Sequence, residues 1–119
     1  MIKHISFIYR PAHMSHAEVV EYWKKVHSQL VKTKLPGLRK YVGNFPVNEP
    51  GSGAQQPGSG KQMQCDAVVE LHFDDVESLH AAMASPGWLS DERKKSSASM
   101  MDFTHHQFVV VEEVVVPLD

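Results

Sequence analysis

A histidine on a helix is the residue best placed for chemistry. His27 lies four residues after Trp23, on the apolar stripe of a predicted helix. A buried imidazole must find a partner or line a cavity, and it titrates near neutral pH. Tyr22 and Trp23 precede it by about one turn, and Tyr41 can face the same space from the next strand. The four side chains could converge around an apolar ligand. Each is also an ordinary core residue, and Trp23 fits that role best. The alternative is a core histidine that hydrogen-bonds to a strand.

Three further polar residues have patterns typical of a site. Glu70 and His72 share one face of a predicted strand, so the carboxylate could orient the imidazole for proton transfer, with plain solvent exposure as the alternative. Arg10 ends the first strand, where a guanidinium could neutralise a carboxylate substrate, or simply lie at the surface. Nothing nearby in the sequence would lower the pKa of Cys65, so we interpret that thiol as structural.

Composition narrows the classes of partner. The chain has 8 histidines, but their spacing matches no metal-binding motif, so no metal is predicted. A net charge of -2 without a basic run argues against nucleic acid. No apolar run is long enough for a membrane span, and no segment has the form of an export signal. With 1 cysteine, no internal disulfide can form. We therefore expect a soluble, cytoplasmic protein, and no motif indicates a cofactor.

Helical and extended patterns alternate along the chain. Residues 1–10 predict a strand, and Ser15 with Glu18 forms a capping box at the start of the His27 helix. Pro36 and Gly37 end that helix, and residues 38–45 predict a second strand. Residues 46–62 are rich in Gly, Pro and Ser and predict a flexible loop. A third strand is expected over 65–73, followed by a helix that begins after Asp75 and restarts at 85–89. Residues 93–102 are polar and poorly patterned, and residues 105–116 predict a final strand.

This order predicts a single α+β domain over residues 1–119. The β-α-β-β-α-β order is that of the ferredoxin-like split β-α-β fold, a four-stranded antiparallel sheet with helices on one face. Apolar residues on both sides of the strands leave an open face to be covered, and burial contributes about 25 cal/mol per Å². Pairing of two copies through that open face would cover it, so we expect a homodimer.

The ordered set of motifs also resembles a known family. The sequence is similar to the EthD family of dimeric α+β barrels, and more distantly to methylmuconolactone methylisomerases. The resemblance covers nearly the whole chain outside the Gly-rich loop. It is carried by Arg10-Pro11, Met14-Ser15-His16, Tyr22-Trp23 with His27, Pro36-Gly37-Leu38 with Tyr41, Val69 to Asp75, Ala84-Ser85-Pro86 and Phe108 to Glu113.

The resemblance implies cofactor-free chemistry on a small apolar or aromatic molecule between sheet and helices, of the oxidoreductase-associated, ether-degradation type. His27 and Tyr41 correspond to catalytic positions. The expected ligand-binding set is Tyr22, Trp23, Glu70, His72, Arg10 and Trp88. The isomerases have a cysteine in the third strand where this chain has Leu71, and a loop histidine that residues 46–62 lack, which argues against lactone isomerisation. Alternatives are a non-catalytic binding protein, a dimeric accessory protein of an oxygenase system and, further off, a polyketide cyclase.

Overall fold

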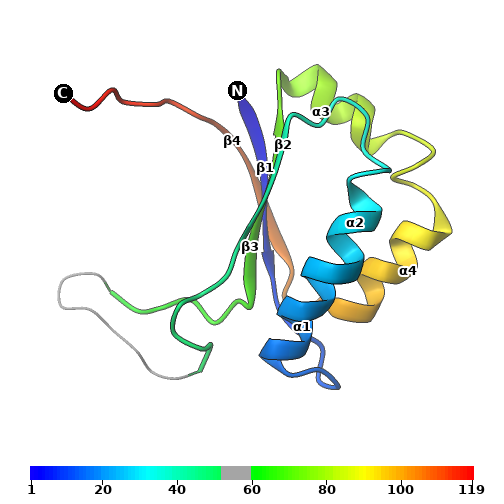
Figure 1. Ribbon diagram of the computed structural model, residues 1–119, viewed down its shortest axis with the longest axis vertical. Helices are drawn as coiled ribbons and strands as arrows, with labels where there is room; N and C mark the ends of the chain where they lie inside the picture. Colours follow the sequence, from blue (N-terminus) through cyan, green and yellow to red (C-terminus); the bar gives the residue numbers. More distant parts are fainter. Residues whose placement is uncertain (52–59) are drawn as a thin grey trace.

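A computed structural model describes residues 1–51 and 60–119. The predicted loop over 46–62 lies partly outside these described residues. Four strands form one antiparallel sheet in the order β2-β3-β1-β4, which is the ferredoxin-like arrangement predicted from the sequence. The strands are β1 (Ile2–Ile8), β2 (Lys40–Asn44), β3 (Ala67–Phe73) and β4 (Gln107–Glu112). All helices lie on one side of this sheet, and the C-terminal tail leaves on the other side (Figure 1).

One continuous helical segment follows β1 and carries the predicted histidine. It consists of α1 (His16–Tyr22), a π-helical turn η1 (Trp23–His27) and α2 (Ser28–Val31). The predicted capping box is present, because the Ser15 hydroxyl accepts from Glu18 N–H and the Glu18 carboxylate accepts from Ser15 N–H. The π turn was not predicted. It arises where Ser28 N–H donates to the Trp23 carbonyl five residues back.

The second half contains two helices, α3 (Val76–Met83) and α4 (Asp91–Met100). The predicted helical restart at 85–89 is wrong, because these residues form turns. The segment that we expected to be unpatterned contains α4 instead. Ser90 caps α4 by accepting from Arg93 N–H, and two acidic residues occupy its first turn. Its buried side chains include two serines, so it lacks the apolar stripe that sequence patterns detect.

Two apolar clusters hold the helices against the sheet. One is centred on Ile8, Val19, Trp23 and Met100, and the other on Val31, Phe73 and Leu79. In β3, Ala67, Val69, Leu71 and Phe73 are buried against the helices, as the predicted alternation requires. The final strand is shorter than expected, since the chain has no strand structure after Glu112, and Val114, Val115 and Val116 are exposed.

Candidate functional site

A small, partly open cavity lies between the sheet and the helices beside His27. Its volume is about 30 Å³. It brings together four residues that the sequence predicted for one site, namely His27, Trp23, Tyr41 and Trp88. The rest of the lining comes from β1, α2, β3 and the end of α4, through Ser6, Ile8, Val31, Val69, Leu71 and Met101. The wall is therefore mostly apolar, with a few polar atoms from the predicted residues.

His27 is held in this wall as a neutral imidazole. The residue is only 3% exposed, and its Nδ1 lies 2.8 Å from the Ser96 hydroxyl oxygen. Burial, assisted by the positive charge of Arg93, lowers the His27 pKa from 6.5 to about 4. At neutral pH one ring nitrogen therefore carries a proton and the other is a lone-pair acceptor. Nε2 makes no hydrogen bond with any described residue, so it remains available to a ligand.

Trp23 and Tyr41 supply two further polar groups. Their ring centroids are 5.2 Å apart in an edge-on arrangement. The indole N–H of Trp23 is buried and has no hydrogen-bond partner of good geometry among the described residues. Its proximity offsets part of the rise in the Tyr41 pKa, but burial dominates and raises that pKa well above its usual value. Tyr41 is thus a neutral phenol, able to donate a hydrogen bond.

A glycine in β2 permits this placement of Trp23. A Cβ atom on Gly43 would lie 2.6 Å from two carbons of the indole ring, closer than any real contact. The π turn has a related effect, since it begins at Trp23 and ends at His27 and both side chains line the cavity. Such turns within α-helices are frequent at functional sites.

Helix α4 contributes site residues that the sequence did not reveal. Ser96 is buried and contacts His27, and its hydroxyl also lies 3.0 Å from the Tyr22 hydroxyl. Tyr22 therefore joins the site through Ser96 and does not line the cavity. The Arg93 guanidinium stacks 3.9 Å over the Trp88 ring and donates to the Trp88 carbonyl. No motif marks these residues, because a serine-rich helix has no periodic apolar signal.

Glu70 and His72 lie on the opposite, open face of the sheet. Their side chains do meet, with His72 Nε2 3.1 Å from the Glu70 carboxylate. Lys3 pairs with Glu70 at 3.1 Å and with Glu113 at 2.9 Å. A hydrogen bond from Asn44, followed by Lys3, lowers the Glu70 pKa. The expected carboxylate–imidazole pair is therefore present, but β3 separates it from the His27 cavity.

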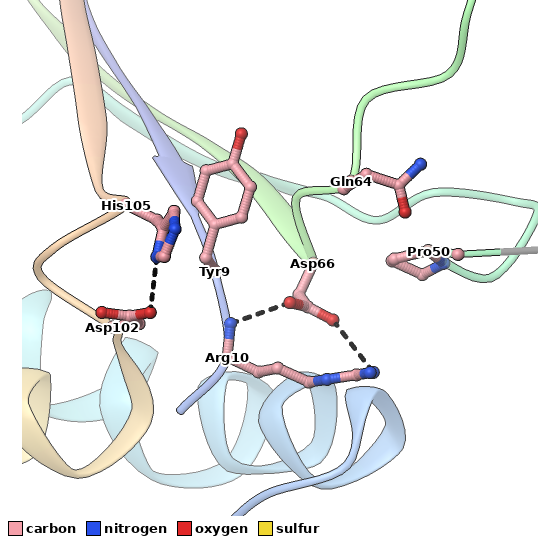
Figure 2. A pocket seen from close by; sticks show the side chains of 8 residues that line it. Tyr9, Arg10, Pro50, Gln64, Asp66, Asp102 and His105 are labelled. Carbon is pink, nitrogen blue, oxygen red and sulfur yellow. Dashed lines mark hydrogen bonds and ion pairs between the residues drawn. The ribbon is translucent and has the colours of Figure 1, made fainter. Parts of the chain in front are cut away.

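Arg10 lies in a different pocket, at the end of β1. This open depression has a volume of about 360 Å³. Buried Asp66 accepts from Arg10 N–H at 2.8 Å and lies 3.8 Å from its guanidinium (Figure 2). On the other side of Tyr9, His105 pairs with Asp102 at 2.7 Å. The charged groups here contact one another, and Arg10 does not reach the His27 cavity.

The described residues contain neither a metal-binding cluster nor a membrane-spanning helix. Within residues 1–51 and 60–119, no three His, Cys, Asp or Glu side chains gather to hold a metal ion. In the same part of the chain, no helix is long and apolar enough to cross a membrane. Cys65 is buried, and burial raises the pKa of its thiol, which keeps it protonated and weakly reactive.

Comparison with sequence models of protein families assigns the chain to one family. The sequence model of the EthD domain matches residues 11–104, which is more than half of the chain. The chain therefore belongs to the EthD family, as its motifs predicted. No functionally curated protein matches it.

Solved structures with this fold are distant in sequence. An ethyl tert-butyl ether degradation family protein of Bacillus halodurans is 22% identical, with a TM-score of 0.69 over 96% of this chain and 99% of its own. A dimeric ferredoxin-like protein of unknown function from Bacteroides fragilis is 15% identical, with a TM-score of 0.59 over 94% and 95%. SnoaB, a cofactor-independent oxygenase of Streptomyces nogalater, is 10% identical, with a TM-score of 0.61 over 97% and 94%. At these identities the likeness shows the fold alone.

Proposed function

We propose that the chain is a cofactor-independent enzyme that transfers a proton to or from a small apolar or aromatic metabolite bound beside His27. One observation carries this proposal: a neutral, buried imidazole lines a small, mostly apolar cavity, with its Nε2 unengaged by described residues. In that state the ring can act as a base at Nε2 or, in the other tautomer, as an acid. The likeness to a cofactor-independent oxygenase supports the class without naming a substrate.

The polar groups beside His27 favour a ligand that carries an oxygen acceptor. Trp23 N–H is a donor without a partner of good geometry, and the raised pKa of Tyr41 keeps its hydroxyl a donor. Donors aimed into a water-poor site stabilise negative charge that develops on a carbonyl or phenol oxygen. His27 would then take or return the proton whose movement creates that charge.

The size of the cavity means that a substrate must open it. A volume of about 30 Å³ holds one or two water molecules, not an aromatic ring. Trp88 and Met101 are partly exposed and follow turns or the end of a helix, so their side chains can move with small backbone cost. We propose that ligand entry displaces these two side chains and leaves the wall of Trp23 and Tyr41 in place.

The test compares two histidine variants on one panel of compounds. Small aromatic carbonyl compounds, phenols and lactones are incubated with the wild type, with and without air, and products are followed by mass spectrometry. His27→Ala should lose turnover while keeping a cooperative unfolding transition and its oligomeric mass. His105→Ala, at an exposed histidine in the other pocket, should keep turnover. Full activity in the His27 variant would refute the assignment.

A second candidate is a non-catalytic accessory or binding protein. The small cavity favours it, since a site evolved to hold a metabolite usually has a volume of several hundred Å³. Native mass spectrometry of the purified protein distinguishes the two. A ligand retained unchanged indicates binding alone, and a panel that yields neither bound ligand nor product indicates an accessory role.

We also propose that two copies pair through the open sheet face. The register places Ile5, Phe7, Val68, Val109 and Val111 on that face, where no helix of the described chain covers them. Two of the solved neighbours with this fold are described as dimeric. The Lys3 ion pairs would lie at the middle of such an interface, where they would help to set its orientation.

A further inference from the structure

A chain of hydroxyl groups joins the buried face of His27 to the protein surface. His27 Nδ1 lies 2.8 Å from Ser96 Oγ, which lies 3.0 Å from Tyr22 Oη. Tyr22 Oη in turn lies 3.1 Å from Ser99 Oγ. His27 and Ser96 are buried, Tyr22 is partly buried and Ser99 is exposed. The chain therefore begins at the cavity wall and ends in solvent, crossing between α1 and α4.

Each hydroxyl carries one hydrogen, which orders the whole chain. In one orientation Tyr22 donates to Ser96 and Ser96 to His27 Nδ1, so Nε2 carries the ring proton. Tyr22 then accepts from solvent or from Ser99, whose single hydrogen is otherwise donated to the Ser96 carbonyl at 2.8 Å. In the other, His27 Nδ1–H donates to Ser96, Ser96 to Tyr22 and Tyr22 towards the surface, so Nε2 is an acceptor. The two orientations correspond to the two tautomers of His27, and they interconvert when one proton moves along each link.

We propose that Ser96 and Tyr22 form a proton relay that exchanges protons between His27 and solvent without passing through the cavity. This inference rests on the proposed function, in which His27 is the acid or base. When Nε2 takes a proton from the ligand, Nδ1 passes its own proton to Ser96, Ser96 passes one to Tyr22, and Tyr22 releases one at the surface. One proton enters the chain and one leaves, and no electrons are transferred. The reverse sequence returns a proton to the ligand.

The surroundings of His27 favour such a route. Burial and the nearby Arg93 charge disfavour the doubly protonated ring, which lowers its pKa to about 4. An extra proton therefore leaves the ring readily at neutral pH. An apolar ligand in the cavity would exclude water from the Nε2 side of the ring. Release through Nδ1 removes the extra proton from the ring as it arrives.

The alternative to a relay is a purely structural role, in which these hydrogen bonds only stabilise the packing of α1 against α4. Buried polar side chains are usually hydrogen-bonded, and such bonds contribute about 0.5–1.5 kcal/mol each to stability. Both interpretations predict some loss of stability when a hydroxyl is removed. Only the relay predicts that proton exchange at the His27 ring depends on Tyr22, because Tyr22 does not contact the ring.

The test measures hydrogen exchange at the His27 ring nitrogens by NMR in protein labelled with nitrogen-15, without any substrate. Tyr22→Phe keeps the ring packing and the bond between Ser96 and His27. It should slow exchange of the ring proton with water by about an order of magnitude, because local opening of the helices is then the remaining route. Ser96→Ala should slow it as well and also change the tautomer ratio. Tyr9→Phe, which removes a phenol at the other pocket, is the matched control and should exchange as the wild type does.

Two results would overturn the relay. One is unchanged ring exchange in Tyr22→Phe. The other is wild-type ring exchange no faster than exchange of the neighbouring backbone amides of α4, which would show that opening is the only route. The exchange rate is independent of turnover, so slowed exchange in Tyr22→Phe alongside full activity in His27→Ala would refute the proposed function and leave the relay standing.

Discussion

Replacing His27 by glutamine should make the protein less sensitive to acid. In the folded chain the His27 pKa is about 4, against 6.5 for an unburied histidine. The unfolded chain therefore binds a proton at a higher pH than the folded chain does. The stability that this difference contributes is complete above pH 6.5 and is lost as the pH falls from there towards 4.

The magnitude follows from the two values. Each pH unit between them corresponds to about 1.36 kcal/mol, so the full loss below both is about 3 kcal/mol. Between about pH 7 and about pH 5 the same linkage gives a loss of about 2 kcal/mol from His27 alone. His4 and His106 also have pKa values lowered chiefly by burial, so the wild type loses stability from several sites at once. The contribution of His27 is therefore obtained by comparing the pH-dependent loss of unfolding free energy in the wild type with that in a His27 variant.

Urea denaturation at the two pH values, at fixed protein concentration, measures this difference. His27→Gln removes the titration but retains a polar side chain, so its loss between pH 7 and pH 5 should be smaller than that of the wild type by about 2 kcal/mol. His80→Gln, at an exposed histidine on α3, controls for the loss of a histidine as such. Equal losses in the wild type and the His27 variant would show that the imidazole is not held neutral by burial.

Two further predictions concern the packing of Trp23 and the open sheet face. Gly43→Ala should destabilise the fold by about 1–3 kcal/mol, because the new Cβ would lie 2.6 Å from the indole ring. Urea denaturation and tryptophan fluorescence check this, and an unchanged spectrum would mean that the ring does not lie against β2. Val109→Asp should convert the proposed dimer to a monomer in light scattering, whereas Val47→Asp, at a fully exposed residue, should not. A Val109 variant with the wild-type mass would refute pairing through this face.

Segments with a clear sequence pattern were sufficient to predict most of the fold. The two-residue alternation of β3 predicted which residues face the helices, and the Ser15 cap predicted where the first helix begins. Trp23 and His27, four residues apart, were expected on one face and do share the cavity. The intervening π turn was not predicted, since it depends on how the helix packs against the rest of the chain.

The missed elements are those whose stability comes from tertiary contacts. Helix α4 buries Ser96, which bonds to His27, and Ser97, which accepts from Arg93 of the same helix, so its sequence looks solvated throughout. Its start is nevertheless visible in Ser90 followed by two acidic residues. Ser96, the relay partner of His27 on this helix, could not be predicted from the sequence, because nothing in a polar helix marks which serine is buried. Whether two residues 69 positions apart hydrogen-bond is a property of the folded chain.

The grouping of Glu70 with His27 could have been corrected from the sequence itself. If Leu71 faces the helices, Glu70 must face away, because neighbouring residues of a strand point to opposite sides. The sheet therefore separates the two proposed sites along a single strand. Val69 and Leu71 line the proposed site, whereas Val68 and Glu70 belong to the proposed dimer face. Because the sheet lies between that face and the cavity, we expect the proposed dimerisation to add no side chain to the cavity and to act on the site only by stiffening β3. A monomeric variant should then keep the His27 pKa and lose mainly stability.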